Sequence, residues 1–370
     1  SIAIVGILFT SCNGPKKDKE ALAFADPLLE NRDTSLSPGN DFFRYACGTW
    51  LKNNPIPTAE NSWGIWSLVQ EETYNRMRKV SEEAAEKKSA AGSNEQKIGD
   101  FYFSGMDTVT IDKLGVTPLN AELQRIDAIK DLKSLGEVIA LHQTYGVGPV
   151  FGAYIFQDEK ASEQQALHFY QGGIGLPDRD YYFNTDSRTK MIRNEYVLHL
   201  AAMFKLMGED SVKAKSNAAT IMKIETTLAK ASRKLEDLRD PYLNYNKMQV
   251  DGLNSLTPSI DWKSMLEGMH IKNVDSVIVG QPEFFREVEK SLKAYPIEDW
   301  KVYLRWQLVN TFAAYLSKPF DDQNFKFYRT VLSGVKEQRP RWKRVVVEVE
   351  NSIGDLLGQL YVQEYVSPAF

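Results

Sequence analysis

Hydrophobic residues recur every three or four positions along most of this chain, which is the period of an α-helix. After Asn61, for example, apolar positions return at Trp66, Val69 and Val80, and charged residues fill the opposite face. One helix is expected to open with a capping box formed by Ser134 and Glu137. The pattern predicts helices at residues 61–88, 93–104, 117–129, 134–145, 187–206, 210–231, 282–292, 300–316 and 346–360.

Two aromatic and β-branched segments interrupt this helical period. Val150–Gln157 and Gln165–Gln171 flank a charged linker, so they predict a β-hairpin. Val274–Val279 is compatible with a further short strand. The glycines of residues 172–175 are interpreted as a backbone turn, because the lysine of a phosphate-binding loop is missing. The predicted fold class is mostly α with a minor β-hairpin.

An aromatic-rich segment, Asp41–Pro57, stands out near the start of the chain. Phe42, Phe43 and Trp50 can share one wide helical face, because residues three and four apart are neighbours on a helix. Pro55 and Pro57 then impose an extended exit. We expect this segment to form a helix that is buried in the core.

Composition narrows the class of protein. The chain has 370 residues, of which 43% are hydrophobic and 25% charged, as in an ordinary globular protein. Its net charge of -4 gives no electrostatic footprint for binding nucleic acid. Acidic pairs such as Asp321–Asp322 are interpreted as solvated surface.

The first residues have the pattern of a targeting segment. Ile2–Phe9 is apolar, too short to span a bilayer, and is followed by small residues and Cys12. Residues 1–11 are interpreted as the remnant of a signal peptide, residues 12–37 as a polar tether and residues 38–370 as one helical domain. The pattern resembles a bacterial lipoprotein signal, which would make Cys12 the lipidated residue. A plain signal peptide and a leftover apolar end are the alternatives.

No catalytic set can be assembled from the sequence. The four histidines are His142, His168, His199 and His270, and none has the spacing of an H-E-x-x-H zinc motif. Each is interpreted as structural. We therefore predict no catalytic residue and no metal ligand in this segment.

Five strings, in order along the chain, resemble the N-terminal domain of neprilysin-family zinc metallopeptidases. The strings are Asp41–Trp50, Lys97–Phe103, Gly175–Tyr182, Arg239–Met248 and Gly358–Val362. The resemblance implies the multi-helix lid domain of a two-domain fold, which closes over a zinc domain carrying H-E-x-x-H. That partner domain would lie C-terminal to this segment and would hold the zinc.

The resemblance also implies a function and a location for the full-length protein. It would be a zinc metalloendopeptidase that hydrolyses oligopeptides through zinc-activated water. Combined with the lipid signal, the implied location is a bacterial cell envelope, anchored at the membrane on the periplasmic or extracellular face.

In the family, contacts to the substrate come from the stretch just after the opening motif. The matching residues here include Trp63, Trp66 and Gln70 as candidates for the lining of the cleft. Mammalian members carry an Arg, which reaches the C-terminal carboxylate of the substrate, and an Asp where this chain has Ser62 and Ser67. This chain therefore lacks the Arg that would bind the C-terminal carboxylate of the substrate at this position. The alternative is that both tryptophans simply pack inside the domain.

Two other functions are open on the sequence alone. A stand-alone α-helical lipoprotein could bind peptides without cutting them. A purely structural surface protein would have no affinity for peptides at all. A downstream H-E-x-x-H motif in the coding sequence separates the enzyme from both.

Overall fold

The computed structural model of the protein describes residues 26–367, which divide into one unit that ends at Pro57 and another that begins at Thr58. The domain start that we predict at residue 38 lies inside the first unit and stays a prediction. Within this unit, hydrogen bonds join residues before and after position 38. The amide of Asp33 donates to Tyr45 O at 2.8 Å, and the Thr49 hydroxyl donates to Arg32 O at 2.6 Å.

The first unit contains α1 (Pro27–Glu30) and α2 (Phe42–Asn53). Asp41 starts α2 by accepting a hydrogen bond from the amide of Arg44 at 2.9 Å, as an N-cap residue does. The helix was predicted correctly, but its predicted burial is wrong for the described residues. Phe42 and Phe43 are 68% and 65% exposed, and Gly48 is the one buried residue of α2. A helical pattern identifies an apolar face without identifying what covers it.

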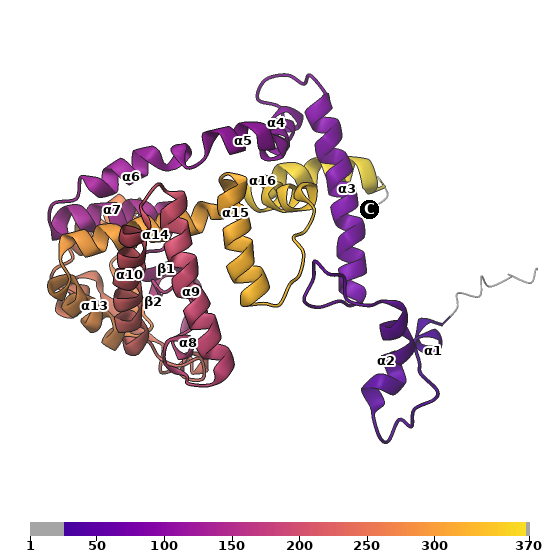
Figure 1. Cartoon of the computed structure of the whole chain (residues 1–370), viewed down its shortest axis with the longest axis horizontal. Helices are drawn as coiled ribbons and strands as arrows, with labels where there is room; N and C mark the ends of the chain where they lie inside the picture. The colour runs from indigo at the N-terminus through magenta and orange to yellow at the C-terminus, as the bar shows by residue number, and fades with distance from the viewer. Residues whose placement is uncertain (1–25, 368–370) are drawn as a thin grey trace, which may run out of the picture. The chain divides into compact units, whose positions relative to one another are not determined.

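The second unit is mostly helical, as predicted, around a small mixed sheet (Figure 1). Its elements in chain order are α3 (Ile65–Glu86), α4 (Asn94–Met106), α5 (Thr108–Leu114), η1 (Thr117–Leu119), α6 (Asn120–Asp127), α7 (Leu132–Thr144), β1 (Phe151–Asp158), β2 (Ala161–Gln171), α8 (Asp180–Phe183), α9 (Ser187–Leu206), α10 (Ser211–Ala231), η2 (Asp237–Arg239), β3 (Asn246–Gln249), η3 (Val250–Gly252), α11 (Leu253–Leu256), α12 (Trp262–Gly268), β4 (Ser276–Val279), α13 (Pro282–Ala294), α14 (Ile297–Phe312), η4 (Ala313–Tyr315), α15 (Lys318–Asn324), η5 (Phe325–Val331) and α16 (Arg341–Tyr365).

The caps of these helices follow the sequence closely, with one shift. Asp210, the first residue of the helix predicted at 210–231, is the N-cap of α10 and accepts from the amides of Val212 and Lys213. The predicted capping box of α7 is three residues too late. Asp131 is the N-cap and accepts from the amide of Ser134 at 2.8 Å, while the Ser134 hydroxyl accepts from the amide of Asp131. Two capping residues with the same spacing competed, and the earlier one begins the helix.

The sheet has the strand order β1–β2–β4–β3. The predicted hairpin is confirmed as the antiparallel pair β1 and β2, with Phe151 opposite Gln171. The predicted short strand is confirmed as β4, which runs parallel to β2 and antiparallel to β3. Strand β3 was missed, because Asn246–Gln249 contains no β-branched or aromatic residue that would signal a strand.

Two separate hydrophobic cores hold the second unit together. The large core lies between the sheet and helices that include α7, α9, α10, α13 and α14. The small core lies between α3, α4 and α16, which gather in one part of Figure 1. The buried residues of the small core are Tyr74, Met77, Val80, Ala84, Ile98, Tyr102, Val345, Val346, Val349 and Leu357.

The glycine-rich turn after β2 packs closely against the large core. Gly173 has a φ of +74°, and a Cβ there would lie 2.7 Å from Val150 Cα. A Cβ on Gly175 would lie 1.9 Å from the hydroxyl of Tyr196. Close approach of the backbone therefore explains these glycines.

A buried carboxylate, Glu225 of α10, lies beneath this turn. Tyr182 and Tyr196 donate their hydroxyl groups to it at 2.7 and 2.9 Å, and Trp306 donates its indole N–H at 3.2 Å. Burial raises the pKa of Glu225 to about 7, although these hydrogen bonds act to lower it. The cluster connects α8, α9, α10 and α14.

Candidate functional site

The stretch predicted to line a substrate cleft lies at the start of α3. Gly64 is the N-cap residue, and Ser67 occupies the third helical position. The Ser67 hydroxyl accepts a hydrogen bond from the amide of Gly64 at 3.1 Å, so this side chain is engaged in capping. Ser62, just before the helix, is exposed.

The first two turns of α3 present an exposed apolar surface, which we call the α3 strip. Trp66 is 85% exposed, so it does not pack within the described residues, whereas Trp63 is half-buried. Gln70 donates its side-chain amide to the hydroxyl of Tyr74 at 2.7 Å. The α3 strip consists of Ile65, Trp66, Leu68 and Val69. Contiguous apolar surface of this kind marks a place of contact with another molecule or domain.

A network of ion pairs fixes the α3 strip against the start of α16. Glu60 accepts two hydrogen bonds from the guanidinium of Arg339, at 2.7 and 2.5 Å, across 279 positions of sequence. Lys343, which is 6% exposed, pairs with Glu71 and lies 3.5 Å from Glu60. Burial acts to raise the pKa of Glu60, but Arg339 and Lys343 hold that pKa below its ordinary value. The carboxylates on both sides of the α3 strip are therefore held by one segment.

These pairings were missed at the level of sequence. The density of basic residues around Pro340 is the one signal in the sequence, since four of the six positions from 339 to 344 are Arg or Lys. Nothing in their spacing identifies Glu60 and Glu71 as partners. We call Arg339, Arg341, Lys343 and Arg344 the basic row.

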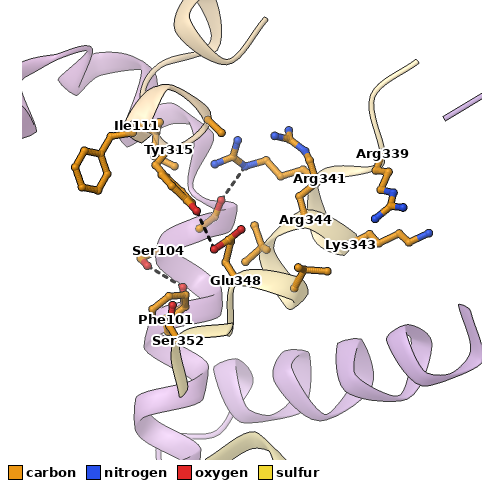
Figure 2. A pocket seen from close by; sticks show the side chains of 15 residues that line it. Phe101, Ser104, Ile111, Tyr315, Arg339, Arg341, Lys343, Arg344, Glu348 and Ser352 are labelled. Carbon is orange, nitrogen blue, oxygen red and sulfur yellow. Dashed lines mark hydrogen bonds between the residues drawn. The ribbon is translucent and has the colours of Figure 1, made fainter. Parts of the chain in front are cut away.

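A groove of about 600 Å³ lies between α4, η4 and α16 (Figure 2). We call it the α4–α16 groove. The basic row and Glu348 lie on one side of it, and Ile111 and Tyr315 on another. The hydroxyl of Tyr315 donates to Glu348 at 2.9 Å, and burial together with this carboxylate raises the pKa of Tyr315 to about 12. The apolar part of its wall is formed by Phe101, Ile111, Phe312, Ala314, Val345 and Val347.

Asp321 corrects one prediction. It was interpreted as part of a solvated acidic face, but it is 5% exposed. It accepts hydrogen bonds from Arg344 at 2.9 Å and from the side-chain amide of Gln338 at 2.9 Å. The prediction was wrong because a distant cation and a distant amide satisfy this carboxylate, which local sequence cannot show.

The histidines form no metal site in the part of the chain that the structure describes. His142, His168 and His199 are all buried, as side chains within helices or a strand. Tyr154 stacks on His168 at 4.7 Å, and Phe327 stacks on His199 at 5.0 Å. Between residues 26 and 367, no three His, Cys, Asp or Glu side chains gather as metal ligands would. The described residues therefore do not fit a zinc ion.

The predicted lipidation site cannot be placed. Cys12 lies outside the described residues, so its lipidation stays a prediction. Within the described part of the chain, every helix is too short or too polar to cross a bilayer.

Comparisons with known proteins place this architecture in a family. A sequence model of peptidase family M13 matches residues 38–369. Neprilysin-3 of Drosophila melanogaster is 29% identical over 371 residues, which cover 95% of this chain and 47% of that protein. Endothelin-converting enzyme 1 of Rattus norvegicus is 28% identical over 378 residues, which cover 98% and 49%.

Solved structures agree with the sequence relatives. The zinc metalloprotease Zmp1 of Mycobacterium tuberculosis, in complex with an inhibitor, matches with a TM-score of 0.86 at 32% identity, over 91% of this chain and 51% of that one. PepO from Lactobacillus rhamnosis shares the fold with a TM-score of 0.77 at 16% identity, over 90% and 52%. The chain spans about half the length of the proteins that it matches.

Proposed function

Because the chain belongs to peptidase family M13, as the N-terminal domain of that family, we propose that it is the substrate-enclosing half of a zinc-dependent metalloendopeptidase that hydrolyses oligopeptides. The observation that carries the proposal is the α3 strip, a fixed apolar surface at the predicted cleft residues. A second half, present in the longer relatives, would hold the zinc and the groups that cut the peptide bond. The described residues supply no catalytic group of their own.

The α3 strip has the properties that enclosing a peptide requires. Trp66 and Ile65 offer apolar surface that a peptide side chain can cover, and burying such surface contributes about 25 cal/mol per Å². Glu60 and Glu71, bound to the basic row, hold the strip in one place, so little ordering remains to oppose binding. Covering the peptide on this side also excludes water from the site of reaction.

Reading the coding sequence beyond Phe370 is the first test of the proposal. A downstream H-E-x-x-H supports the peptidase, whereas a stop codon favours the rival, a peptide-binding lipoprotein without catalysis. The longer protein should then cleave oligopeptides and lose that activity when zinc is chelated.

The role of the α3 strip is tested by Trp66→Ala in the longer protein. We expect kcat/KM for an oligopeptide to fall by about tenfold or more, since truncating a central aromatic contact costs about 1–2 kcal/mol or more. Val212→Ala is the matched control, because Val212 is 81% exposed on α10 and lies outside the proposed cleft. Equal kcat/KM values for Trp66→Ala and wild type would refute the proposal that the α3 strip binds the substrate.

The membrane anchor is proposed from the sequence, as a lipid on Cys12 that holds the protein in a bacterial cell envelope. Lipid chains of this kind supply the binding energy of the anchor. Cys12→Ala should therefore move the protein from the membrane fraction to the soluble fraction of cells. If the variant stays with the membranes, another element anchors it, and the lipoprotein proposal fails.

A further inference from the structure

The α4–α16 groove has an apolar lining that is open to solvent, as one half of a protein interface has. Its volume of about 600 Å³ lies within the range of ligand pockets, and apolar side chains such as Phe101 and Ile111 line it. The helices α4 and α16 belong to the small core, to which three helices contribute buried residues in the described part of the chain. An apolar hollow beside such a thin core exposes hydrophobic surface that a further layer of structure would cover.

The charges around the groove are balanced except at one position. Within the basic row, Arg339 pairs with Glu60, Lys343 with Glu71 and Arg344 with Asp321. These three pairs leave Arg341.

Arg341 has no carboxylate within ion-pair distance among the residues from 26 to 367. Its Nε donates to the carbonyl oxygen of Gly105 at 2.8 Å, which fixes the direction of the side chain. Burial, and then the charge of Arg344, lower the pKa of Arg341. The nearby carboxylates are otherwise engaged: Glu348 accepts from Tyr315, and Asp112 accepts from the amide of Lys318 at 2.6 Å. A partly desolvated guanidinium of this kind gains from a bidentate carboxylate.

The adjoining guanidinium adds a second unsatisfied donor. The Nε of Arg344 is buried and has no hydrogen-bond partner in the described part of the chain. Arg344 and Asp321 also line two further hollows, so Arg344 borders three depressions of the surface. An acidic group that enters at this point would meet two cations.

The nature of the walls favours a folded surface as the occupant over a free extended peptide. The groove is lined by helices, whose backbone N–H and C=O groups bond within the helix and offer no strand edge. The groove can therefore bind an occupant through its side chains but not by adding a strand to an edge. The structural match to Zmp1 covers 91% of this chain but 51% of Zmp1. A longer relative of this kind therefore carries a second half that is large enough to fill the groove.

We propose that the α4–α16 groove seats the second half of the longer protein, through an acidic side chain that pairs with Arg341 and an adjoining apolar side chain that packs between Phe101 and Ile111. This inference rests on the proposed function, because it needs the second half to exist. The partner is thus an acidic and apolar patch of the same polypeptide.

The test compares access to the groove in this 370-residue chain and in the longer protein. Ser352 lines the groove and is exposed, so Ser352→Cys, in a background with Cys12→Ala and Cys47→Ala, can be labelled with a maleimide. We expect labelling to be slower in the longer protein by about tenfold or more, as for a site that opens only by local separation. Ser216→Cys, exposed on α10, is the matched control and should label equally in both proteins.

A charge reversal tests the ion pair itself. In the longer protein, Arg341→Glu should restore fast labelling of Ser352→Cys. Arg188→Glu should leave it slow, because Arg188 also donates to a backbone carbonyl, that of Leu332, and lies outside the groove. Slow labelling that persists in Arg341→Glu would overturn the role of Arg341.

The other outcomes also decide the matter. Equal labelling of Ser352→Cys in both proteins would overturn the docking proposal, as would protection that appears only when an oligopeptide is added. Labelling does not depend on activity, so an inactive longer protein with a protected groove would refute the proposed function alone. A coding sequence that ends at Phe370 would remove both proposals together.

Discussion

The buried carboxylate of Glu225 should make the stability of the protein depend on pH in a way that one substitution isolates. Glu225 is fully buried, and the hydroxyl groups of Tyr182 and Tyr196 and the indole of Trp306 surround it. Glu225→Gln keeps the size of the side chain and removes its titration. The amide mimics the protonated acid, and the tyrosine oxygens can accept from it.

The sign and size of the effect follow from the two pKa values. The unfolded chain releases this proton near the ordinary value of 4.5, but the folded protein keeps it up to about pH 7. Since the folded state binds the proton more tightly, the stabilisation is fully present below pH 4.5 and is lost as the pH rises to about 7. At about 1.4 kcal/mol for each pH unit, the free energy of unfolding of the wild type loses about 3 kcal/mol relative to Glu225→Gln.

Urea unfolding at pH 4.5, 6 and 7.5, followed by tryptophan fluorescence, measures this difference. Comparison with the variant is needed because other groups titrate too: burial lowers the pKa of His199 to about 3, which costs stability as the pH falls below 6.5. Glu289→Gln is a control with the opposite sign. Burial acts to raise the pKa of Glu289, but Lys293 and Ser259 hold it below its ordinary value, so its stabilisation is lost as the pH falls. A difference for Glu225→Gln that changes by less than about 1 kcal/mol over this range would refute the reasoning.

Three further predictions use other parts of the chain. In the longer protein, Ser62→Arg should create a preference of about 10- to 150-fold in kcat/KM for substrates with a free C-terminal carboxylate, the equivalent of about 1.5–3 kcal/mol. A wild type that already prefers the free acid over the amidated peptide would contradict this prediction. Gly175→Ala should lower the urea midpoint or prevent folding, because the new Cβ would lie 1.9 Å from the Tyr196 hydroxyl; an unchanged midpoint would show that the turn can move. Residues 37–370 alone should bind no stoichiometric zinc and hydrolyse no peptide, and metal analysis that finds one tightly held zinc per chain would disprove this.

Much of the fold was predictable because helical periods and caps are local signals. Asp210 and Ser93 begin their helices where the sequence places them, and the aromatic hairpin formed as predicted. What failed depended on partners far away in the sequence. Strand β3 exists because β4 pairs with it, and the burial of Phe42 depended on a cover that the described residues do not provide.

In the candidate site, too, the local features were predictable and the contacts with distant partners were not. The resemblance to a family located Ser62–Gln70, and the structure places this stretch at the start of α3. Its supports, Arg339 and Lys343, could not be predicted, because an ion pair between distant positions leaves no trace in the spacing of either segment. In an isolated sequence, the charges of Glu60 and Glu71 are indistinguishable from those of a solvated surface.

The joining of early and late segments in the small core sets an order of events during synthesis. Glu60 meets Arg339 across 279 positions, and α3 and α4 share their core with α16. At about 5–20 residues per second, a ribosome needs roughly 15–55 s to add the intervening chain. Throughout that interval Met77 and Val80 have no partner from α16, whereas the hairpin of β1 and β2 can form within moments of leaving the exit tunnel. We expect nascent chains arrested before Arg339 to recruit chaperones through α3, and to release them once α16 emerges.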